Sequence, residues 1–342
     1  MKREFAANLR CLSCVGSDWN VEAAREDERE IREGRLRCAR CGSEHAIGSG
    51  VVDFLDPKNE GLQREIQGWI ELAGPLPEYL ATQMTALPYY PKGSWTHVAP
   101  DFFQLFEHFD FAGKRVVDIG AGRSWSSRHL ASLGRASQVV AIDVLTNRFL
   151  GLETADLFFH DDGSFFERIR GDVHRMPLRD GWADAVFSCA TLHHSSDLVA
   201  LFREVWRVLR PGGQLLFVAE PSKKASIPDR RPQNAEAEHG INENLYSLAE
   251  YSQALRTVGF RFRRLVPRSI RYRLVYPDPD FQGEIPKALE RLTRSERGRN
   301  FLERLLSSRL LGPILYRYWS LPLTGVASKP ASDLVENRPA EN

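Results

Sequence analysis

The sequence is short of three things: cysteine, long apolar runs and net charge. Only five of its 342 residues are cysteine, too few for a disulfide framework in a chain of this length. No run approaches the ~20 apolar residues that a membrane-spanning helix needs, and residues 1–10 lack the apolar core of a signal peptide. We therefore expect a cytoplasmic protein with reduced thiols and no transmembrane segment.

The formal net charge is +1, from 46 basic and 45 acidic residues. Such a chain has no overall basic field, so its charge does not imply nonspecific binding to nucleic acid. Hydrophobic residues make up 42% of the chain. At this length they can bury a large core, and we expect more than one domain.

Four of the cysteines form two pairs near the start of the chain, Cys11-x-x-Cys14 and Cys38-x-x-Cys41. Each pair can turn both sulfurs toward one point, and two pairs complete a closed, tetrahedral zinc site of the structural kind. A segment this small has little apolar core, so the metal would supply its folding energy. Two disulfides in a secreted domain, or redox thiols, are the alternatives, and the lack of a secretion signal favours zinc.

Residues 1–57 are expected to form a separate zinc-ribbon domain. His45 could substitute as a ligand, but four thiolates already fill the shell, so we expect it on an exposed strand. The charged residues 21–37 predict a surface excursion between the two cysteine pairs. Residues 9–55 resemble the zinc-ribbon domain that activates tRNA and protein methyltransferases and also occurs fused ahead of methyltransferase domains. They depart from it in having no proline after the first cysteine of either pair.

Residues 58–111 are rich in proline and aromatic residues. Because proline ends helices, we expect a connector of short helices joined by stiff turns. Tyr89, Tyr90 and Trp95 would either form a lid over a ligand or cover the edge of the core.

The most informative stretch is VVDIGAGRSW, residues 116–125. A buried strand leads through Asp118 into a turn that contains Gly120 and Gly122. The next apolar run ends in Asp143. Glycines let a ligand lie against the backbone, and an acid at the tip of the second strand accepts both hydroxyls of a ribose. The pattern predicts a nucleoside site.

A dinucleotide would require a third glycine where the helix meets the pyrophosphate, but the bulky Trp125 stands there. A nucleoside without phosphates fits better, and S-adenosylmethionine is one. Asp118 can attract the ammonium group of its amino-acid tail, directly or through water. Asp172 follows a short third strand and can accept the adenine amine, while the backbone of Val173 donates. Cys189 is expected to be a small buried residue of the fourth strand, with its backbone near the cofactor.

Strand and helix patterns alternate through residues 112–275, which predicts an α/β fold with a doubly wound, mostly parallel Rossmann-like sheet. This stretch resembles the class I S-adenosylmethionine-dependent methyltransferases, of the group that includes ubiquinone and menaquinone methylases. The resemblance implies S-adenosylmethionine as cofactor and methyl transfer as activity. Ser124 replaces one glycine of the first motif. Four motifs carry the match, in the expected order: VVDIGAG, VVAID, GDVHRMPLRDGWADAVFS and LRPGGQLLFVAEP.

Methyl transfer from a sulfonium needs alignment and, for a protonated nucleophile, a base. His194, after the fourth strand, is a catalytic candidate, although it or its neighbour could instead pack in the core or cap the next helix. The polar residues 236–248 have no hydrophobic period and predict substrate contacts, with His239 as a second catalytic candidate. A solvated loop is the alternative there.

The C-terminal third is less informative. Residues 276–320 predict a helical insertion that roofs the substrate pocket, before a closing strand at 321–330 and a disordered tail at 331–342. The amphipathic stretch 301–323 would pack on its own domain, on another subunit or on a membrane interface. Seven arginines within residues 256–273 would either hold a phosphate or form the wet face of an edge strand.

These features favour methyl transfer from S-adenosylmethionine to a small-molecule, glycan or lipid-linked acceptor, at oxygen or nitrogen. An RNA base methyltransferase is the alternative, since some rRNA guanine methylases also begin with a zinc module. However, CATLHH stands where the asparagine-proline-proline-aromatic motif for exocyclic amines would follow the fourth strand. A noncatalytic scaffold is the third possibility, and it predicts a damaged cofactor site. The oligomeric state is left open.

Overall fold

The computed structural model describes the chain except for residues 91–94, 160–163, 225–231, 233, 271–293 and 332–342. The described strands form one sheet, in the order β1-β2-β3-β4-β7-β6-β5-β8-β9-β11-β10. Neighbours from β4 to β9 run parallel, whereas β11 is antiparallel to both β9 and β10. The predicted mostly parallel central sheet is therefore confirmed.

Seven strands make up the central part of the sheet, and their order reverses direction between β5 and β8. In spatial order they are β7 (Glu167–Arg170), β6 (Gln138–Asp143), β5 (Arg115–Ile119), β8 (Ala183–Cys189), β9 (Leu209–Glu220), β11 (Leu323–Ser328) and β10 (Arg261–Leu265).

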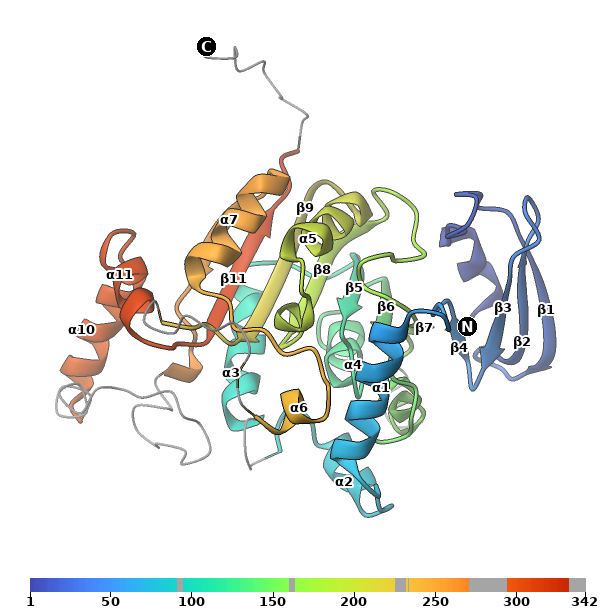
Figure 1. Cartoon of the computed structure of the whole chain (residues 1–342), viewed down its shortest axis with the longest axis horizontal. Coiled ribbons are helices and arrows are strands. Elements are labelled where there is room, and N and C mark those ends of the chain that lie inside the picture. Colours follow the sequence, from blue (N-terminus) through green and yellow to red (C-terminus); the bar gives the residue numbers. More distant parts are fainter. Residues whose placement is uncertain (91–94, 160–163, 225–231, 233, 271–293, 332–342) are drawn as a thin grey trace, which may run out of the picture.

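Each face of the central sheet is covered by its own helices (Figure 1). Alternate residues of a strand point to opposite faces, so Val117 packs in one apolar cluster and Val116 in the other. The first cluster includes α5 and α7, and the second includes α3, α4 and two 3-10 helices, η2 and η3. Their bounds are α5 (Leu198–Val208), α7 (Leu248–Val258), α3 (Trp95–Gln104), α4 (Trp125–Ser132), η2 (Leu105–Glu107) and η3 (Leu152–Leu157).

Local signals in the sequence start and stop these helices. Asp197 caps α5 by accepting hydrogen bonds from two backbone N–H groups of its first turn. Ser247 and Glu250 form a reciprocal capping box at the start of α7, and Gly259 ends that helix with φ +110°.

The N-terminal segment extends the central sheet instead of standing apart from it. A 3-10 helix, η1 (Arg3–Asn8), is followed by an antiparallel ribbon of four strands. The last of them pairs in parallel with β7, with Val51 opposite Arg168. The charged residues 21–37 form most of a largely exposed hairpin of the first two strands. The strands are β1 (Trp19–Glu26), β2 (Ile31–Cys38), β3 (Glu44–Gly48) and β4 (Val51–Asp53).

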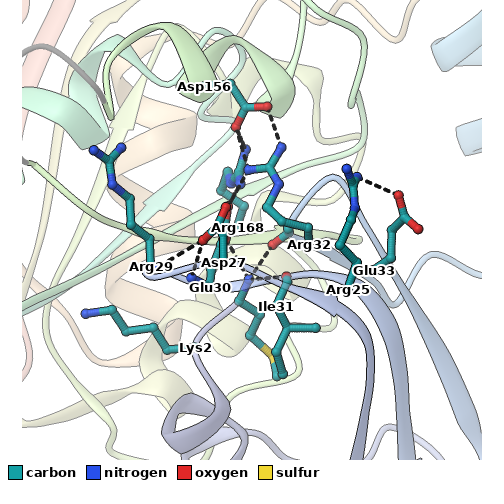
Figure 2. A network of polar contacts seen from close by, with 12 residues as sticks. Lys2, Arg25, Asp27, Arg29, Glu30, Ile31, Arg32, Glu33, Asp156 and Arg168 are labelled. Carbon is teal, nitrogen blue, oxygen red and sulfur yellow. Dashed lines mark hydrogen bonds and ion pairs between the residues drawn. The ribbon is translucent and has the colours of Figure 1, made fainter.

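Buried charges hold the junction between this ribbon and the central sheet (Figure 2). Arg168 of β7 is fully buried and pairs with Glu30, in the β1–β2 turn, and with Asp156, at 3.0 Å between Nη1 and Oδ1. Arg32 reaches the same aspartate, with 2.7 Å between Nη2 and Oδ2. The α-amino group of Met1 donates to Glu30 over 2.7 Å. Arg168, Glu30 and the Met1 amino group therefore each have a partner of opposite sign in the junction.

The connector contributes α1 (Glu60–Ala73), which lies over the carboxyl ends of the central strands, and α2 (Leu80–Thr85), which contacts η3. The short α6 (Ala235–Glu238) lies against α1. Gly68 of α1 permits this contact, because a Cβ there would lie 2.3 Å from the carbonyl oxygen of His239. Of the three aromatic residues expected as a lid or a cover, Tyr89 stacks on Phe103 of α3, outside the cavity described below.

The described part of the predicted insertion consists of α10 (Glu296–Ser307) and α11 (Leu311–Tyr318), at the opposite end of the sheet from the ribbon (Figure 1). Residues 276–293, and 332–342 of the predicted tail, lie outside the described residues. Tyr316 is buried beneath Arg264, whose guanidinium lies 4.7 Å from the ring centroid. Among the described residues, no helix is long and apolar enough to cross a bilayer.

Candidate active site

A cavity of about 920 Å³ lies at the carboxyl ends of the parallel strands. It opens where the strand order reverses, since the loops that leave β5 and β8 diverge there. Its floor is the turn after β5 and the ends of β6, β7 and β8, and its roof is α1 with residues 237–243. Neither α10 nor α11 contributes, so the prediction that the insertion roofs the pocket is wrong for its described part: these helices pack beside α7 instead. The cavity brings together seven predicted residues: Gly120, Gly122, Asp143, Asp172, Val173, Cys189 and His194.

Two glycines shape the turn after β5. Gly120 and Gly122 both have positive φ, +63° and +47°. A Cβ on Gly120 would lie 2.2 Å from the side chain of Thr191, whereas nothing lies within 4 Å of the Cβ position of Gly122. The turn therefore needs glycine at 120 for space, and at 122 it exposes bare backbone to the cavity, as a close-lying ligand requires.

Asp143, at the end of β6, is buried but lines the cavity. Its Oδ2 accepts the N–H of Gly122 and its Oδ1 that of Leu145, each over 2.8 Å. Burial raises the pKa of Asp143, and these hydrogen bonds oppose the shift. They fix the carboxylate and leave each oxygen a lone pair, so both oxygens can accept a ribose hydroxyl.

Asp118 lies beneath the turn and is not among the residues that line the cavity. Its Oδ2 accepts hydrogen bonds from the hydroxyls of Ser126 and Ser127, in the first turn of α4, each over 2.6 Å. Burial raises the pKa of Asp118 to about 7, against the effect of these two hydroxyls. Asp118 thus anchors α4 under the turn.

Asp172 belongs to a chain of three side chains at the end of β7. Its Oδ1 accepts the backbone N–H of His174 over 2.8 Å and lies 2.9 Å from Nδ1 of that ring. Nε2 of His174 lies 2.8 Å from Oγ of Ser195. Although burial opposes it, His174 lowers the pKa of Asp172. The carboxylate therefore stays ionised beside Val173, where an exocyclic amine would find an acceptor.

Cys189 ends β8 and contributes a small, half-buried side chain to the cavity wall. Burial raises the pKa of its thiol well above the usual range, so it is a neutral thiol and not a reactive thiolate.

Two histidines follow β8 in the 3-10 helix η4 (Leu192–His194). Glu220, at the end of β9, bonds Nδ1 of His193 over 2.9 Å and accepts the backbone N–H of Thr191 over 2.8 Å. From the other side, Oε1 of Glu243 lies 3.5 Å from Nε2 of His193 and 3.4 Å from Nδ1 of His194. Of the pair, only His194 lines the cavity.

The two rings have opposite protonation tendencies. Burial disfavours a charge on His193, but hydrogen bonds to Glu220 and Glu243 outweigh it and raise its pKa to about 9. Burial, together with the charge on His193, lowers the pKa of His194 to about 4. His193 is thus an imidazolium between two carboxylates, and His194 beside it is a neutral imidazole.

Glu65 of the roof helix was not identified from the sequence. Its Oε1 lies 3.9 Å from Nδ1 of His194, and burial, reinforced by nearby acids, raises its pKa to about 7. One sequence signal could have identified it. Glu65 is an acid between Leu62 and Trp69, which lie about one turn away on either side of the same helical face and also line the cavity.

The polar residues 236–248 reach the cavity through Asn242 and Glu243. His239, the second catalytic candidate, is not brought to the site: it is half-buried and does not line the cavity. Its Nδ1 lies 2.7 Å from the carbonyl oxygen of Ala235, on α6.

The four cysteines of the ribbon form a separate group, with all four Sγ atoms within 4.8 Å of one another. Cys11 and Cys41 are 3.6 Å apart at sulfur, as are Cys14 and Cys38. Four thiolates at 2.3 Å from a zinc ion would lie about 3.8 Å apart, so the arrangement fits that metal. His45 is outside the group, with Nδ1 3.1 Å from a backbone carbonyl of β4.

Two relatives show what the chain is similar to in sequence. It is 32% identical over 117 residues to malonyl-[acyl-carrier protein] O-methyltransferase of Legionella pneumophila, a match that covers 34% of this chain and 39% of that protein. It is 26% identical over 155 residues to sterol 24-C-methyltransferase erg6 of Aspergillus fumigatus, covering 43% of this chain and 40% of that protein. The chain thus spans about two fifths of the length of these relatives.

Two solved structures are similar in shape. One is phosphoethanolamine N-methyltransferase 2 of Haemonchus contortus with S-adenosyl-L-methionine, with a TM-score of 0.46 and 20% identity over 74% of this chain and 58% of that one. The other is a Haloferax volcanii complex of the Trm112 methyltransferase activator with a methyltransferase, with a TM-score of 0.43 and 16% identity over 75% and 100%. Both TM-scores are below 0.5, so the fold is described here by its strand order and not by these similarities.

A protein-family model matches the central part of the chain. Residues 117–217 match the model described as a methyltransferase domain. This range begins in β5, ends in β9 and contains the floor of the cavity. The chain therefore carries a methyltransferase domain of the S-adenosylmethionine-dependent class I type.

Proposed function

We propose that the protein transfers the methyl group of S-adenosylmethionine to an oxygen or nitrogen of a small molecule, a glycan or a lipid-linked intermediate. One observation carries the proposal. The cavity at the carboxyl ends of β5 to β8 joins a bare glycine turn and Asp143, on one side, to the ionisable side chains of His194 and Glu243 on the other.

The floor of the cavity would hold the cofactor. Asp143 would accept the ribose hydroxyls, Asp172 and the backbone of Val173 would bind adenine, and the turn at Gly120 and Gly122 would lie against the amino-acid tail. When bound, the cofactor supplies a methyl carbon on a positively charged sulfur, which departs as a neutral thioether. The residues of the chain therefore need to hold and align the reactants, with little charge to neutralise.

The roof and η4 would hold the acceptor. His194 would contact an acceptor there, and its position in the cavity lining supports this role. Glu243 and Glu65 lie beside it. His239, on the outer side of α6, would contact only an acceptor that extends beyond the cavity.

The size of the cavity favours a small acceptor group over a folded RNA. Its volume of about 920 Å³ falls within the ~300–1,000 Å³ of small-molecule sites, and α1 roofs it. The names of the two relatives, which concern malonyl-[acyl-carrier protein] and a sterol, point to the same class of acceptor.

We also propose that Cys11, Cys14, Cys38 and Cys41 bind one structural zinc ion. The sulfur–sulfur distances of 3.6 Å support this, and so does the charged composition of the ribbon, which leaves it little core of its own.

Calorimetry with S-adenosylhomocysteine tests the proposed cofactor. The native chain should bind it, and Asp143→Ala should weaken binding by about 10²-fold, since two hydrogen bonds to a charged group contribute roughly 1.5 kcal/mol each. Asp184→Ala is the control. It removes an acid at the opposite end of β8, paired with Arg210, and should bind as the native chain does. No heat with the native chain would reject the proposal.

A further inference from the structure

A second group of metal-binding side chains, separate from the four cysteines, lies at the acceptor side of the cavity. Nε2 of His193, Nδ1 of His194 and a carboxylate oxygen of Glu243 lie within 4.8 Å of one another. The glutamate oxygen is 3.5 Å from the first nitrogen and 3.4 Å from the second. An ion bound at ~2.0–2.1 Å holds neighbouring ligand atoms about 3.0–3.4 Å apart. Both glutamate–histidine distances therefore already stand within a few tenths of an ångström of the spacing that one ion requires.

The surroundings orient the ligands as those of a metal site do. Glu220 bonds Nδ1 of His193 and thereby directs Nε2 toward Glu243. A carboxylate behind a histidine is the usual support of a ligating imidazole. Glu220 is itself fully buried, and it also accepts a backbone N–H of the same turn, so the support is rigid.

The remaining neighbours add negative charge and oxygen atoms. Oε1 of Glu65 lies 3.9 Å from Nδ1 of His194, and the carbonyl oxygen of Asn242 lies 3.1 Å from the same nitrogen. A cation there would take the place of the proton that Nδ1 of His194 donates to the carbonyl oxygen of Asn242. Both Glu65 and Asn242 line the cavity, so the cation would face the space where the acceptor binds.

We propose that His193, His194 and Glu243 bind a divalent cation of the first transition series, and that its open positions bind the acceptor through an anionic oxygen or two neighbouring hydroxyl oxygens. Two imidazoles and one carboxylate suit manganese, iron, cobalt or zinc. His194 then acts as a ligand in place of a base. The part concerning the acceptor rests on the proposed methyl transfer, whereas the cation site stands on the geometry of its three ligands.

Manganese is the probe for this site, because Mn²⁺ favours oxygen ligands over thiolates and will not compete for the zinc of the ribbon. Electron paramagnetic resonance of free Mn²⁺, in a titration of the full chain, should show one saturable site. Glu243→Gln should weaken it at least tenfold. Glu238→Gln changes an exposed acid on α6 and should leave the site unchanged. Equal affinity in the native chain and in Glu243→Gln, or no saturable binding, overturns the proposal.

Two further measurements keep the outcomes apart. If Glu243→Gln fails to fold, His194→Ala takes its place with the same expectation. Binding of S-adenosylhomocysteine to each variant is measured alongside. Saturable Mn²⁺ binding without binding of the nucleoside supports the cation site and rejects methyl transfer. Binding of the nucleoside without saturable Mn²⁺ binding rejects the cation site alone. 4-Nitrocatechol, which offers two neighbouring oxygens, should bind at least tenfold more tightly with Mn²⁺ than without it. Equal affinity overturns the acceptor class.

Discussion

At Gly120 the site depends on the absence of a side chain. We expect Gly120→Ala to lower the melting temperature and abolish binding of S-adenosylhomocysteine, because a left-handed alanine costs roughly 1 kcal/mol and its Cβ would also collide with Thr191. Gly122→Ala is the matched control, since it has the same sign of φ but open space around its Cβ. Thermal unfolding followed by circular dichroism should show the larger loss at Gly120, and equal losses would contradict this account of the turn.

The residues of the cofactor side could be named from the sequence because they follow strand ends at fixed spacing, and all strands of a parallel sheet end at one edge. On the acceptor side, the sequence identified His194 and residues 236–248 but neither Glu65 nor Glu220. Glu65 comes from a roof helix, and Glu220 reaches His193 from 27 residues further along the chain. Their positions are set by packing, which no local pattern encodes.

Among the elements, the contact of β4 with β7 depends on the buried pair of Arg168 and Glu30. We expect Glu30→Ala to lower the free energy of unfolding by ~3 kcal/mol or more, because it leaves a fully buried guanidinium with only one of its two acids. Urea unfolding measures this effect. The double variant Glu30→Met with Arg168→Met should lose less than the single variant, since the buried guanidinium is removed together with its acid.

Glu33→Ala provides the control for that experiment. Glu33 lies in the same hairpin and pairs with Arg25, but both side chains are more than half exposed, at 53% and 63%. Exposed ion pairs contribute little to stability, so the free energy of unfolding of Glu33→Ala should stay within about 0.5 kcal/mol of that of the native chain. A loss at Glu33 as large as that at Glu30 would contradict the importance of the buried junction.

The alternation of strands and helices predicted the central sheet well, because apolar runs of strand length mark buried parallel strands. It did not predict that the ribbon joins this sheet. The residues that hold the junction, Glu30 and Arg168, are 138 positions apart, and each reads as an ordinary surface charge in its own segment.

For the whole molecule, the continuous sheet links the proposed zinc site of the ribbon to the stability of the methyltransferase domain. We expect about one thiolate-bound zinc per chain, released when a mercurial titrates the thiols and detected with a metallochromic dye. Its removal should lower the melting temperature of the whole chain, because β7 then loses its neighbour β4. Cys189→Ser lies outside the cluster and should keep the zinc. Gently purified chain without zinc would contradict this.

The layout of the molecule follows the predicted order of segments, from ribbon through connector to Rossmann-like core. The roof of the cavity was assigned to the wrong segment in the sequence analysis. The sequence pattern of residues 276–320 predicts a helical cover, but in the described part Leu302, Leu306 and Tyr316 bury the apolar face of α10 and α11 beside α7 and β10. Amphipathicity indicates that a helix packs, and it does not say against what.

The most direct test of the account is a crystal structure of the chain with S-adenosylhomocysteine bound. We expect both ribose hydroxyls on Asp143, adenine beside Asp172 and Val173, and the sulfur pointing across the cavity toward His194 and Glu243. A nucleoside bound elsewhere, or one whose sulfur points away from these two side chains, would contradict it.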